Sequence, residues 1–487
     1  MPTTNNLKDK AAQGFLWGAL NNGTMQVLNA VFGIVLARLL SQEDYGLIGM
    51  LTIFTLIANS LQDSGFVTAL TNRCNATHRD YNSVFWFNIC ISLCLYIILF
   101  FLAPFIADFF SEPILTDLSR YYFFGFFIAS FSIVPRAILF RQIRQRELAI
   151  MALVSLLISG IVGITMAYHG MAYWGLATQT ITFNLMVSIL SWALARWRPS
   201  LQISIQPIRE MFGFSSKMLI TNIFNQVNNN IFSLILGKLY TKVEVGTYNQ
   251  ANKWNLMGAS TITGMVQGVA QPTFVQVGDD PERLRRTFSK MLRFTCFVSF
   301  PVMFGFSLIA PEFIVLLIKE KWLSSAHLMQ YLCIGGAFLP IATLYFNLII
   351  SRGKSDVYMW NIIAQGITIL GSILFVHAAG GGITHMVQTY VAIIILWTGI
   401  WHIFLYREIR YPILSAIKDI IPFLLTASAS MLITYFATRW ITILPLLLIS
   451  RILLASLIYL ASLWLFGAKI LRECIGYLLH SKTKKQV

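Results

Sequence analysis

The chain has 487 residues, of which 56% are hydrophobic and 11% charged, and its mean hydropathy is +0.68. Its 36 Lys and Arg outnumber its 20 Asp and Glu, which leaves a formal net charge of +16 at pH 7. A soluble protein of this length could not cover its surface with so few charged side chains, so the composition excludes a soluble multi-domain protein and predicts a polytopic membrane protein.

Apolar stretches of about 20 residues are long enough to cross the hydrocarbon of a bilayer as helices. The first such stretch is too long for a signal peptide and lacks a small-residue cleavage site, so it is predicted to remain as the first helix. The predicted fold class is therefore all-α. Its fourteen predicted transmembrane helices lie at roughly residues 14–37, 47–70, 82–103, 118–140, 147–168, 173–195, 213–236, 246–271, 290–310, 326–350, 357–378, 383–405, 419–438 and 445–466.

The first and seventh predicted helices carry the same sequence pattern. Residues 21–47 align with residues 221–247 without a gap, and the identical pairs are Asn22/Asn222, Gln26/Gln226, Val27/Val227, Asn29/Asn229, Phe32/Phe232, Leu36/Leu236, Leu39/Leu239 and Gly46/Gly246. A repeat of this long period indicates two similar halves, and because six helices precede the second copy, the two copies run parallel. We therefore predict an N-terminal six-helix lobe (1–195), a cytoplasmic linker (196–212), a C-terminal six-helix lobe (213–405), and two extra transmembrane helices with a basic tail (406–487).

Polar side chains recur on one face of each repeated helix. They are Asn22, Gln26 and Asn29 in the first copy and Asn222, Gln226 and Asn229 in the second, at helical spacing. An unpaired amide that faces lipid costs several kcal/mol, so these faces are predicted to contact protein or water. Hydrogen bonds between helices would satisfy them. The duplication favours the other interpretation, a hydrophilic cavity shared by the two lobes.

The turn after the first predicted helix has a distinctive sequence, ARLLSQEDYGLIGM at residues 37–50. Ser41 can cap the next helix, with Glu43 and Asp44 in its first turn. This run, followed by residues 62–66 (QDSGF), resembles the opening of the polysaccharide-transporter branch of the multidrug/oligosaccharidyl-lipid/polysaccharide exporter superfamily. The branch includes O-antigen, colanic-acid and teichuronic-acid exporters. Residues 103–106 and 310–313, predicted Ala-Pro turns after the third and ninth helices, agree with the resemblance, which covers essentially the whole chain.

The resemblance implies a flippase or exporter for surface polysaccharide biosynthesis in the bacterial cytoplasmic membrane. Its substrate would be an oligosaccharide linked to a lipid, undecaprenyl diphosphate, and it would work by alternating access. The implied partners are this lipid-linked oligosaccharide, membrane lipids, a polysaccharide polymerase and glycosyltransferases. Stripping the sugar hydroxyls of water costs a few kcal/mol each, so the cargo requires a hydrophilic cavity between two lobes.

The basic residues are distributed unevenly among the predicted loops. With the N-terminus in the cytoplasm, most Lys and Arg fall at the two ends of the chain and in the cytoplasmic loops, as the positive-inside rule requires. The most charged loop, residues 278–289, is predicted to be cytoplasmic, whereas Glu43 and Asp44 face outward. The net charge therefore indicates topology, with both termini in the cytoplasm, and no nucleic-acid partner is expected.

Two ionisable side chains inside predicted helices are candidates for function. Lys253 shares a polar helix face with Asn249 and lies about two turns from the predicted outer end, so it could contact the diphosphate of the carrier lipid. It could instead pair with Asp63 or Glu244, or extend its ammonium group toward the interface. Asp63 could exchange a coupling proton, or its carboxylate could bond to neighbouring backbone groups.

Two other function classes remain open at this point. Asp63 keeps a multidrug or cation exporter of the same superfamily possible, although fourteen helices and the basic residues count against it. A membrane polysaccharide polymerase or acyltransferase would need a catalytic cluster, but the seven histidines are scattered and the outer loops are short. The six cysteines show no metal-ligand spacing, and no phosphate-binding glycine motif occurs, so we expect no enzyme, no cofactor and no metal.

Overall fold

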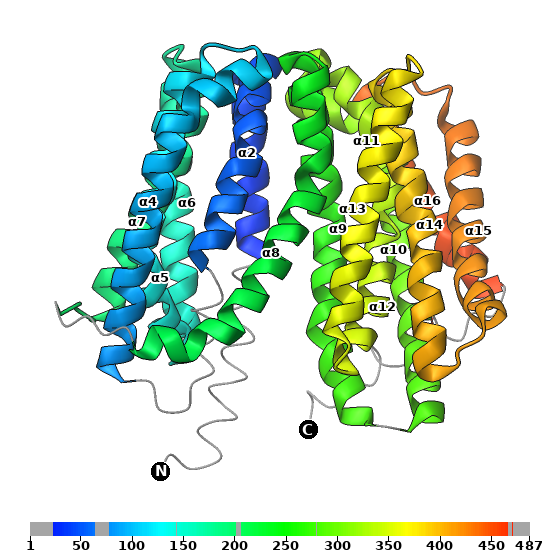
Figure 1. Ribbon diagram of the computed structural model, residues 1–487. Helices are drawn as coiled ribbons and strands as arrows, with labels where there is room; N and C mark the ends of the chain where they lie inside the picture. The colour runs from blue at the N-terminus through cyan, green and yellow to red at the C-terminus, as the bar shows by residue number, and fades with distance from the viewer. Residues whose placement is uncertain are drawn as a thin grey trace, which may run out of the picture. The chain divides into compact units, whose positions relative to one another are not determined.

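The computed structural model describes residues 23–63, 77–142, 144–200, 206–278, 280–465 and 470. Within these ranges the chain is almost entirely α-helical and contains no strand (Figure 1). A helix, Gly23–Leu39, precedes the labelled helices. These are α2 (Gln42–Asp63), α4 (His78–Phe110), α5 (Leu115–Arg141), α6 (Gln145–Tyr168), α7 (Ala172–Ala195), α8 (Gln206–Leu239), α9 (Lys242–Val277), α10 (Pro281–Ile318), α11 (Leu323–Gly336), α12 (Leu339–Ser351), α13 (Ser355–Ala378), α14 (Ile383–Ile409), α15 (Ile413–Thr438) and α16 (Leu444–Leu465).

Ten spans among the described residues are long and apolar enough to cross a membrane, one of them combining α11 and α12. The protein is therefore a multi-pass membrane protein, as the composition predicts. The other predicted segments coincide with the helix Gly23–Leu39 and with α7, α8 and α9, which are shorter or more polar. The count of fourteen stays a prediction.

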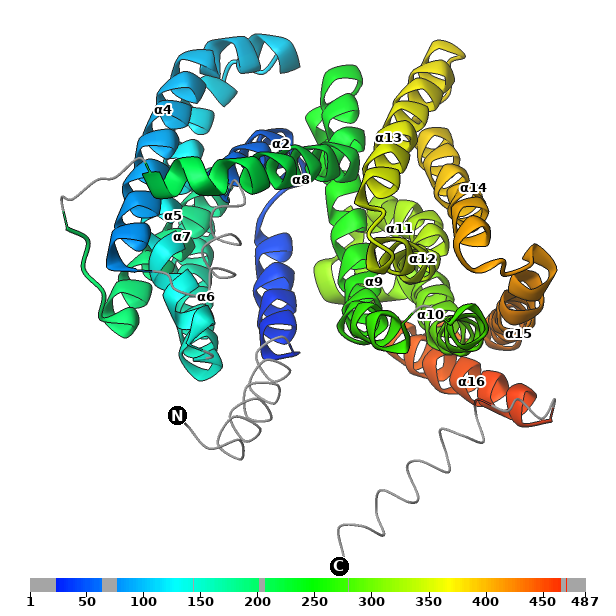
Figure 2. The ribbon, with the colours of Figure 1, turned by 60° about the horizontal axis from the view of Figure 1, so that its bottom comes forward.

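The internal contacts divide the chain into two units, Met1–Asn249 and Gln250–Val487. In the first unit, α4, α5, α6 and α7 pack side by side, and α2 packs against α5, α7 and α8 (Figures 1 and 2). Phe85 and Val134 are fully buried where α4 meets α5, with Trp192 of α7 packed against them. These apolar contacts hold α4, α5 and α7 together, and α2 packs against this bundle.

The described part of the predicted linker is held against α4. The Asn82 side chain accepts a hydrogen bond from the Ser200 amide at 3.0 Å, and the Trp86 indole donates to the Ser200 carbonyl at 2.8 Å. Helix α8 then begins at Gln206, so the last part of the segment predicted as linker is helical. Pro207 lies in the first turn of α8, where no amide hydrogen bond is lost, and therefore does not prevent the helix.

The second unit is built around α10, which contacts α11, α12, α14, α15 and α16. The segment predicted as one helix at 326–350 is interrupted: α11 ends at Gly336 and α12 begins at Leu339, with Pro340 in its first turn. The break frees the Ala337 carbonyl, and the Ser299 hydroxyl of α10 donates a hydrogen bond to it at 2.7 Å. A side chain from a neighbouring helix thus satisfies the broken backbone inside the unit.

Three predicted boundaries are wrong because the helices run on past them. Pro104 and Pro311 lie inside α4 and α10 and do not mark turns. The charged segment 278–289 is mostly the start of α10, where Asp280 caps the helix by accepting the amides of Glu282 and Arg283 at 3.0 and 3.2 Å. Charged side chains in the first turns of a long helix therefore looked like a loop.

Candidate functional site

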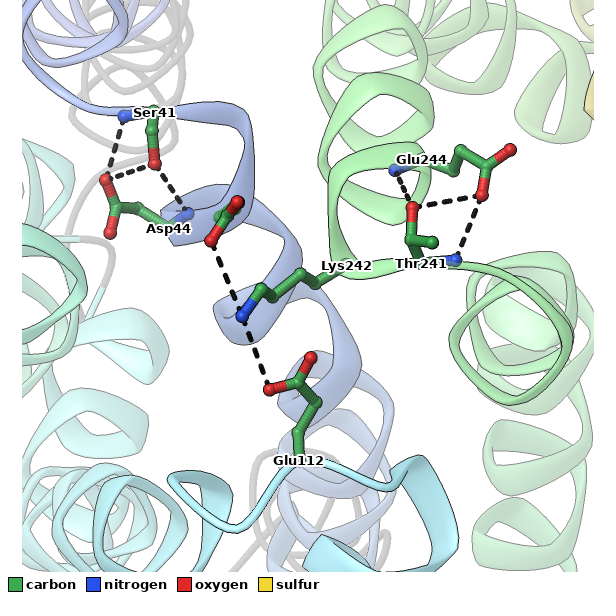
Figure 3. Close-up of polar contacts among 7 residues, drawn as sticks. Ser41, Asp44, Glu112, Thr241, Lys242 and Glu244 are labelled. Atoms are coloured by element: carbon green, nitrogen blue, oxygen red, sulfur yellow. Dashed lines mark hydrogen bonds and ion pairs between the residues drawn. The ribbon is translucent and has the colours of Figure 1, made fainter.

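The starts of α2 and α9 are capped in the same way, at equivalent positions of the repeat (Figure 3). The Asp44 carboxylate accepts the Ser41 amide at 2.8 Å and the Ser41 hydroxyl at 2.7 Å, and the Asp44 amide donates to that hydroxyl at 3.2 Å. Thr241 and Glu244 make the same three bonds at 2.9, 3.0 and 3.4 Å. The predicted cap at Ser41 is confirmed. Each reciprocal cap satisfies amides that a helix start would otherwise leave unpaired.

A pair of glycines from the two repeats lies in direct backbone contact. A Cβ atom placed on Gly46 would collide with the Lys242 carbonyl oxygen, and one placed on Gly246 would collide with the Gln42 carbonyl oxygen. Residues 42 and 46 correspond to residues 242 and 246, so the contact is reciprocal. We call Gly46, Gly246, Gln42 and Lys242 the glycine junction. The identity of Gly46 and Gly246 follows from it, because a side chain at either position would separate the two helix starts.

Lys242 links the glycine junction to two carboxylates. Its Nζ atom lies 3.4 Å from the Glu43 carboxylate at the start of α2 and 3.4 Å from the Glu112 carboxylate in the turn after α4 (Figure 3). Partial burial lowers the pKa of Lys242, but the Coulombic attraction of Glu112 and Glu43 outweighs burial and raises that pKa above its ordinary value. Lys242 therefore stays protonated at physiological pH and holds three segments of the first unit together.

The predicted polar stripes are described only in part. Asn22 and the side chain of Asn229 lie outside the described residues. On the helix Gly23–Leu39 the Asn29 side chain is exposed and Gln26 is half-buried, and on α8 both Asn222 and Gln226 are half-buried. These four side chains make no hydrogen bond to any other described residue. Among the described residues, these amides thus lack the interhelical partners of the first interpretation, and none of the four side chains is fully buried.

Asn249, in contrast, is engaged between helices. Its Oδ1 atom accepts a hydrogen bond from the Ser233 hydroxyl of α8 at 2.9 Å, and its amide nitrogen packs against the Cα of Gly49 on α2. Within the part of the chain that the structure describes, this amide nitrogen is buried without a hydrogen-bond partner. Asn249 therefore serves helix packing next to the glycine junction.

Lys253 lies one turn further along α9 and is half-buried. Of its two predicted structural partners, Glu244 is bonded to Thr241, and the Asp63 side chain lies outside the described residues. Lys253 makes no ion pair or hydrogen bond with any described residue. Further along the same face of α9 the side chains are exposed, and a Cβ atom at Gly264 would meet no atom within 4 Å.

The residues 35–327 match the family of polysaccharide biosynthesis proteins. The chain belongs to this family. The matched region includes the glycine junction, α9 with Lys253, and all of α10. It confirms the family that the residues 37–50 indicate.

Several curated proteins are similar to this polysaccharide biosynthesis protein. Lipopolysaccharide biosynthesis protein WzxC of Escherichia coli (strain K12) is 23% identical, covering 72% of either chain. Teichuronic acid biosynthesis protein TuaB of Bacillus subtilis (strain 168) is 24% identical, covering 85% of this chain and 86% of the relative. Succinoglycan biosynthesis transport protein ExoT of Rhizobium meliloti (strain 1021) is 22% identical over 74% of this chain and 73% of the relative.

Solved structures share the fold. The lipid II flippase MurJ in an inward closed conformation aligns with a TM-score of 0.75 at 16% identity, covering 95% of this chain and 100% of MurJ. An inward-facing multidrug resistance MATE family transporter of the MOP superfamily aligns with a TM-score of 0.61 at 13% identity, covering 83% of this chain and 95% of the transporter. At these low sequence identities, the structural similarity establishes the fold of this polysaccharide biosynthesis protein.

Sequence reasoning missed two charged contacts of this family member. It recognised the pair Gly46/Gly246 but gave the pair no role, and it did not foresee that Lys242 would reach Glu112. It also did not foresee the contact of Arg451, which lies within the predicted helix 445–466 and whose guanidinium is 2.7 Å from the buried Glu312 carboxylate of α10. The rarity of an arginine inside an apolar segment was the available signal.

Proposed function

We propose that this protein is a flippase that moves a lipid-linked oligosaccharide across the bacterial cytoplasmic membrane for surface polysaccharide biosynthesis. The observation that carries the proposal is the half-buried Lys253, which lacks a partner among the described residues of a long, polar-faced helix. The carrier lipid is undecaprenyl diphosphate, glycosyltransferases build the substrate, and a polymerase takes the product. Membership of the polysaccharide biosynthesis family and the MurJ-like fold support this assignment.

The two copies of the repeat belong to two lobes, residues 1–195 and 213–405, joined by the linker 196–212. Residues 406–487 add the two further helices and the basic cytoplasmic end. Asn22, Gln26, Asn29, Asn222, Gln226, Asn229 and Lys253 line the hydrophilic cavity between the lobes, whereas Asn249, also predicted to line it, is engaged in packing between helices. The absence of hydrogen bonds from Gln26, Asn29, Asn222 and Gln226 to other described residues supports this role, because water or sugar hydroxyls then satisfy these amides.

Alternating access assigns a role to the glycine junction. It lies at the predicted outer ends of α2 and α9, so it closes the outer side while the cavity faces the cytoplasm. Export requires that Gly46 and Gly246 separate and that Lys242 release Glu43 or Glu112. The junction is then the outer gate of the flippase.

Lys253 binds the diphosphate of the carrier lipid. A lysine near the centre of a bilayer costs about 2.5 to 3.5 kcal/mol on insertion scales. A charge pair at about 4 Å contributes about 4 kcal/mol at an effective dielectric constant near 20. The interaction with an anionic substrate thus offsets the cost, and Glu244, the nearest acid on α9, is committed to the cap at Thr241.

The direct test measures translocation of an undecaprenyl-diphosphate oligosaccharide in proteoliposomes. Lys253→Ala is expected to lower the initial rate at least tenfold, with partial recovery in Lys253→Arg. The matched control is Lys321→Ala, which removes one exposed lysine outside the long helices. If Lys253→Ala and the parent translocate the oligosaccharide at equal rates, Lys253 does not contribute to substrate binding. No translocation by the parent protein would refute the flippase itself.

Asp63 is the proposed site of ion coupling, at the end of α2. If its carboxylate exchanges a proton during transport, Asp63→Asn abolishes the response of the translocation rate to an imposed proton gradient. The rate without a gradient then stays within about twofold of the parent. An Asp63→Asn variant that responds like the parent assigns this carboxylate to a structural role.

A further inference from the structure

The second unit contains a basic cavity of about 380 Å³ where α10 and α15 begin. This volume falls in the range of small-molecule sites, about 300 to 1,000 Å³. Four basic side chains line it, against one carboxylate: Arg285, Arg286 and Arg293 of α10, and Lys418 and Asp419 of α15. Both helix starts lie at the lower end of this unit in Figure 1. We call this cavity the basic pocket.

The single carboxylate in the basic pocket is already satisfied. Asp419 is 3% exposed and accepts hydrogen bonds from the Ser289 and Tyr411 hydroxyls and from Nε of Arg293 at 2.5 Å. Three donors leave this carboxylate little capacity to neutralise a further cation. The other basic side chains therefore give the pocket an excess of positive charge.

Two guanidinium groups are held in place with donors to spare. Arg293 is fixed through Nε by Asp419, and Arg285 is fixed through Nε by the Ile409 carbonyl at the end of α14. Each anchor uses one of five N–H donors, so the terminal amino groups stay available in a defined orientation. Arg286 pairs with the exposed Glu282 at 3.3 Å, and Lys418 is exposed. An arrangement of fixed and mobile cations suits a phosphate group.

The start of α15 adds a second source of positive potential. Pro412 precedes the helix and provides no side-chain cap, so the first amides of α15 have no side-chain acceptor. Ser415, in the first turn, lines the pocket. The positive end of the helix dipole therefore adds to the field of the arginines.

Apolar side chains border the basic pocket. Leu414, Ile421 and Leu425 lie at helical spacing from the pocket residue Lys418 and so share one side of α15 with it, and they are 68%, 41% and 58% exposed. In a membrane protein such side chains face the acyl chains, so the pocket lies where the hydrocarbon meets the headgroups. A soluble anion would not use this apolar border, whereas a lipid would use the pocket and the border together.

We propose that the basic pocket binds the phosphate of an anionic glycerophospholipid. The phosphate contacts the free amino groups of Arg285 and Arg293, with Lys418 and Arg286 closing over it, and the acyl chains lie along Leu414 and Ile421. A lipid held this way bridges α10 and α15 and stabilises the attachment of the last two helices. The site is distinct from the transport cavity, and the proposal does not rest on flippase activity.

The test titrates the purified full-length protein in detergent with phosphatidylglycerol or phosphatidylcholine and counts bound lipid by native mass spectrometry. The pocket variant is Arg286→Gln with Lys418→Gln, both at exposed positions, and the one contact it removes is the surface pair of Arg286 with the exposed Glu282. The matched control is Arg407→Gln with Arg410→Gln, two exposed arginines near the end of α14. Far-UV circular dichroism and elution volume verify that both variants fold.

The parent is expected to bind one phosphatidylglycerol at least tenfold more tightly than phosphatidylcholine. The pocket variant is expected to lose about thirtyfold in this affinity, since each of the two cations removed contributes about 1 kcal/mol near a membrane surface, and the control less than twofold. An equal loss in the control would assign the binding to diffuse surface charge. Displacement of the lipid by millimolar inorganic phosphate, or binding of polyprenyl diphosphate in preference to phosphatidylglycerol, would also overturn the proposal.

Discussion

A methyl group at the glycine junction is expected to open the proposed outer gate. In Gly46→Ala or Gly246→Ala the new Cβ atom would overlap a backbone carbonyl oxygen of the other repeat, and backbone cannot move aside as a flexible side chain can. Overpacking of this kind costs about 1 to 3 kcal/mol. Separation of the two helix starts relieves the overlap, so the open population rises by a factor of about 5 to 150.

Thiol accessibility measures this population. Thr247, beside Gly246, is 6% exposed, so Thr247→Cys reacts slowly with an impermeant maleimide while the junction is closed. The background replaces the six native cysteines by alanine. Gly264→Ala is the matched control, since its Cβ atom meets no neighbour and it gains the same helix propensity. If the cysteine at position 247 reacts no faster in Gly46→Ala than in Gly264→Ala, the close contact of the glycines does not keep the gate closed.

The remaining predictions concern charged side chains. Arg451→Leu leaves the buried Glu312 carboxylate without its partner at 2.7 Å, so stability in detergent falls by about 3 to 5 kcal/mol, and adding Glu312→Leu recovers most of the loss. A double variant no more stable than the single one contradicts this. Lys242→Gln lowers stability by about 1 kcal/mol at low salt and less at high salt. The raised pKa of Lys242 keeps this difference constant from about neutral pH up to its ordinary value of 10.5, and the difference disappears as pH rises through the raised pKa. A difference that changes between about pH 6 and pH 9 would contradict this assignment. Because the segment 278–289 is predicted to be cytoplasmic, Glu282→Cys should react with an impermeant maleimide only after the cells are permeabilised. Labelling of this cysteine in intact cells would contradict the predicted topology.

Local sequence signals were reliable where the interactions are local. The cap at Ser41 depends on Asp44, only three residues away. This cap was predicted from a short pattern and is confirmed. The family was also recognisable, because its opening motif lies in one such short segment.

Predictions failed where the outcome depends on tertiary contacts. Pro104 and Pro311 looked like helix ends, but apolar packing continues each helix beyond its proline. The ion pair of Lys242 with Glu112 joins residues far apart in the sequence, and no periodicity indicates it. The polar stripes were predictable only in part. Helical spacing placed Gln26 and Asn29 on one helix face, but spacing alone does not show whether water or another helix covers that face.

The glycine junction is symmetric in its backbone and asymmetric in its charges, and this combination suits a gate that must open under a modest bias. Both repeats contribute the same cap and the same glycine, so the backbone contact is equal on either side. Only the second repeat carries a lysine at the equivalent of Gln42, and its pairs with Glu43 and Glu112 are partly exposed. Exposed pairs contribute about 0 to 1 kcal/mol each. A substrate that binds the open state about 4 kcal/mol more tightly than the closed state would therefore exceed their combined contribution and open the gate.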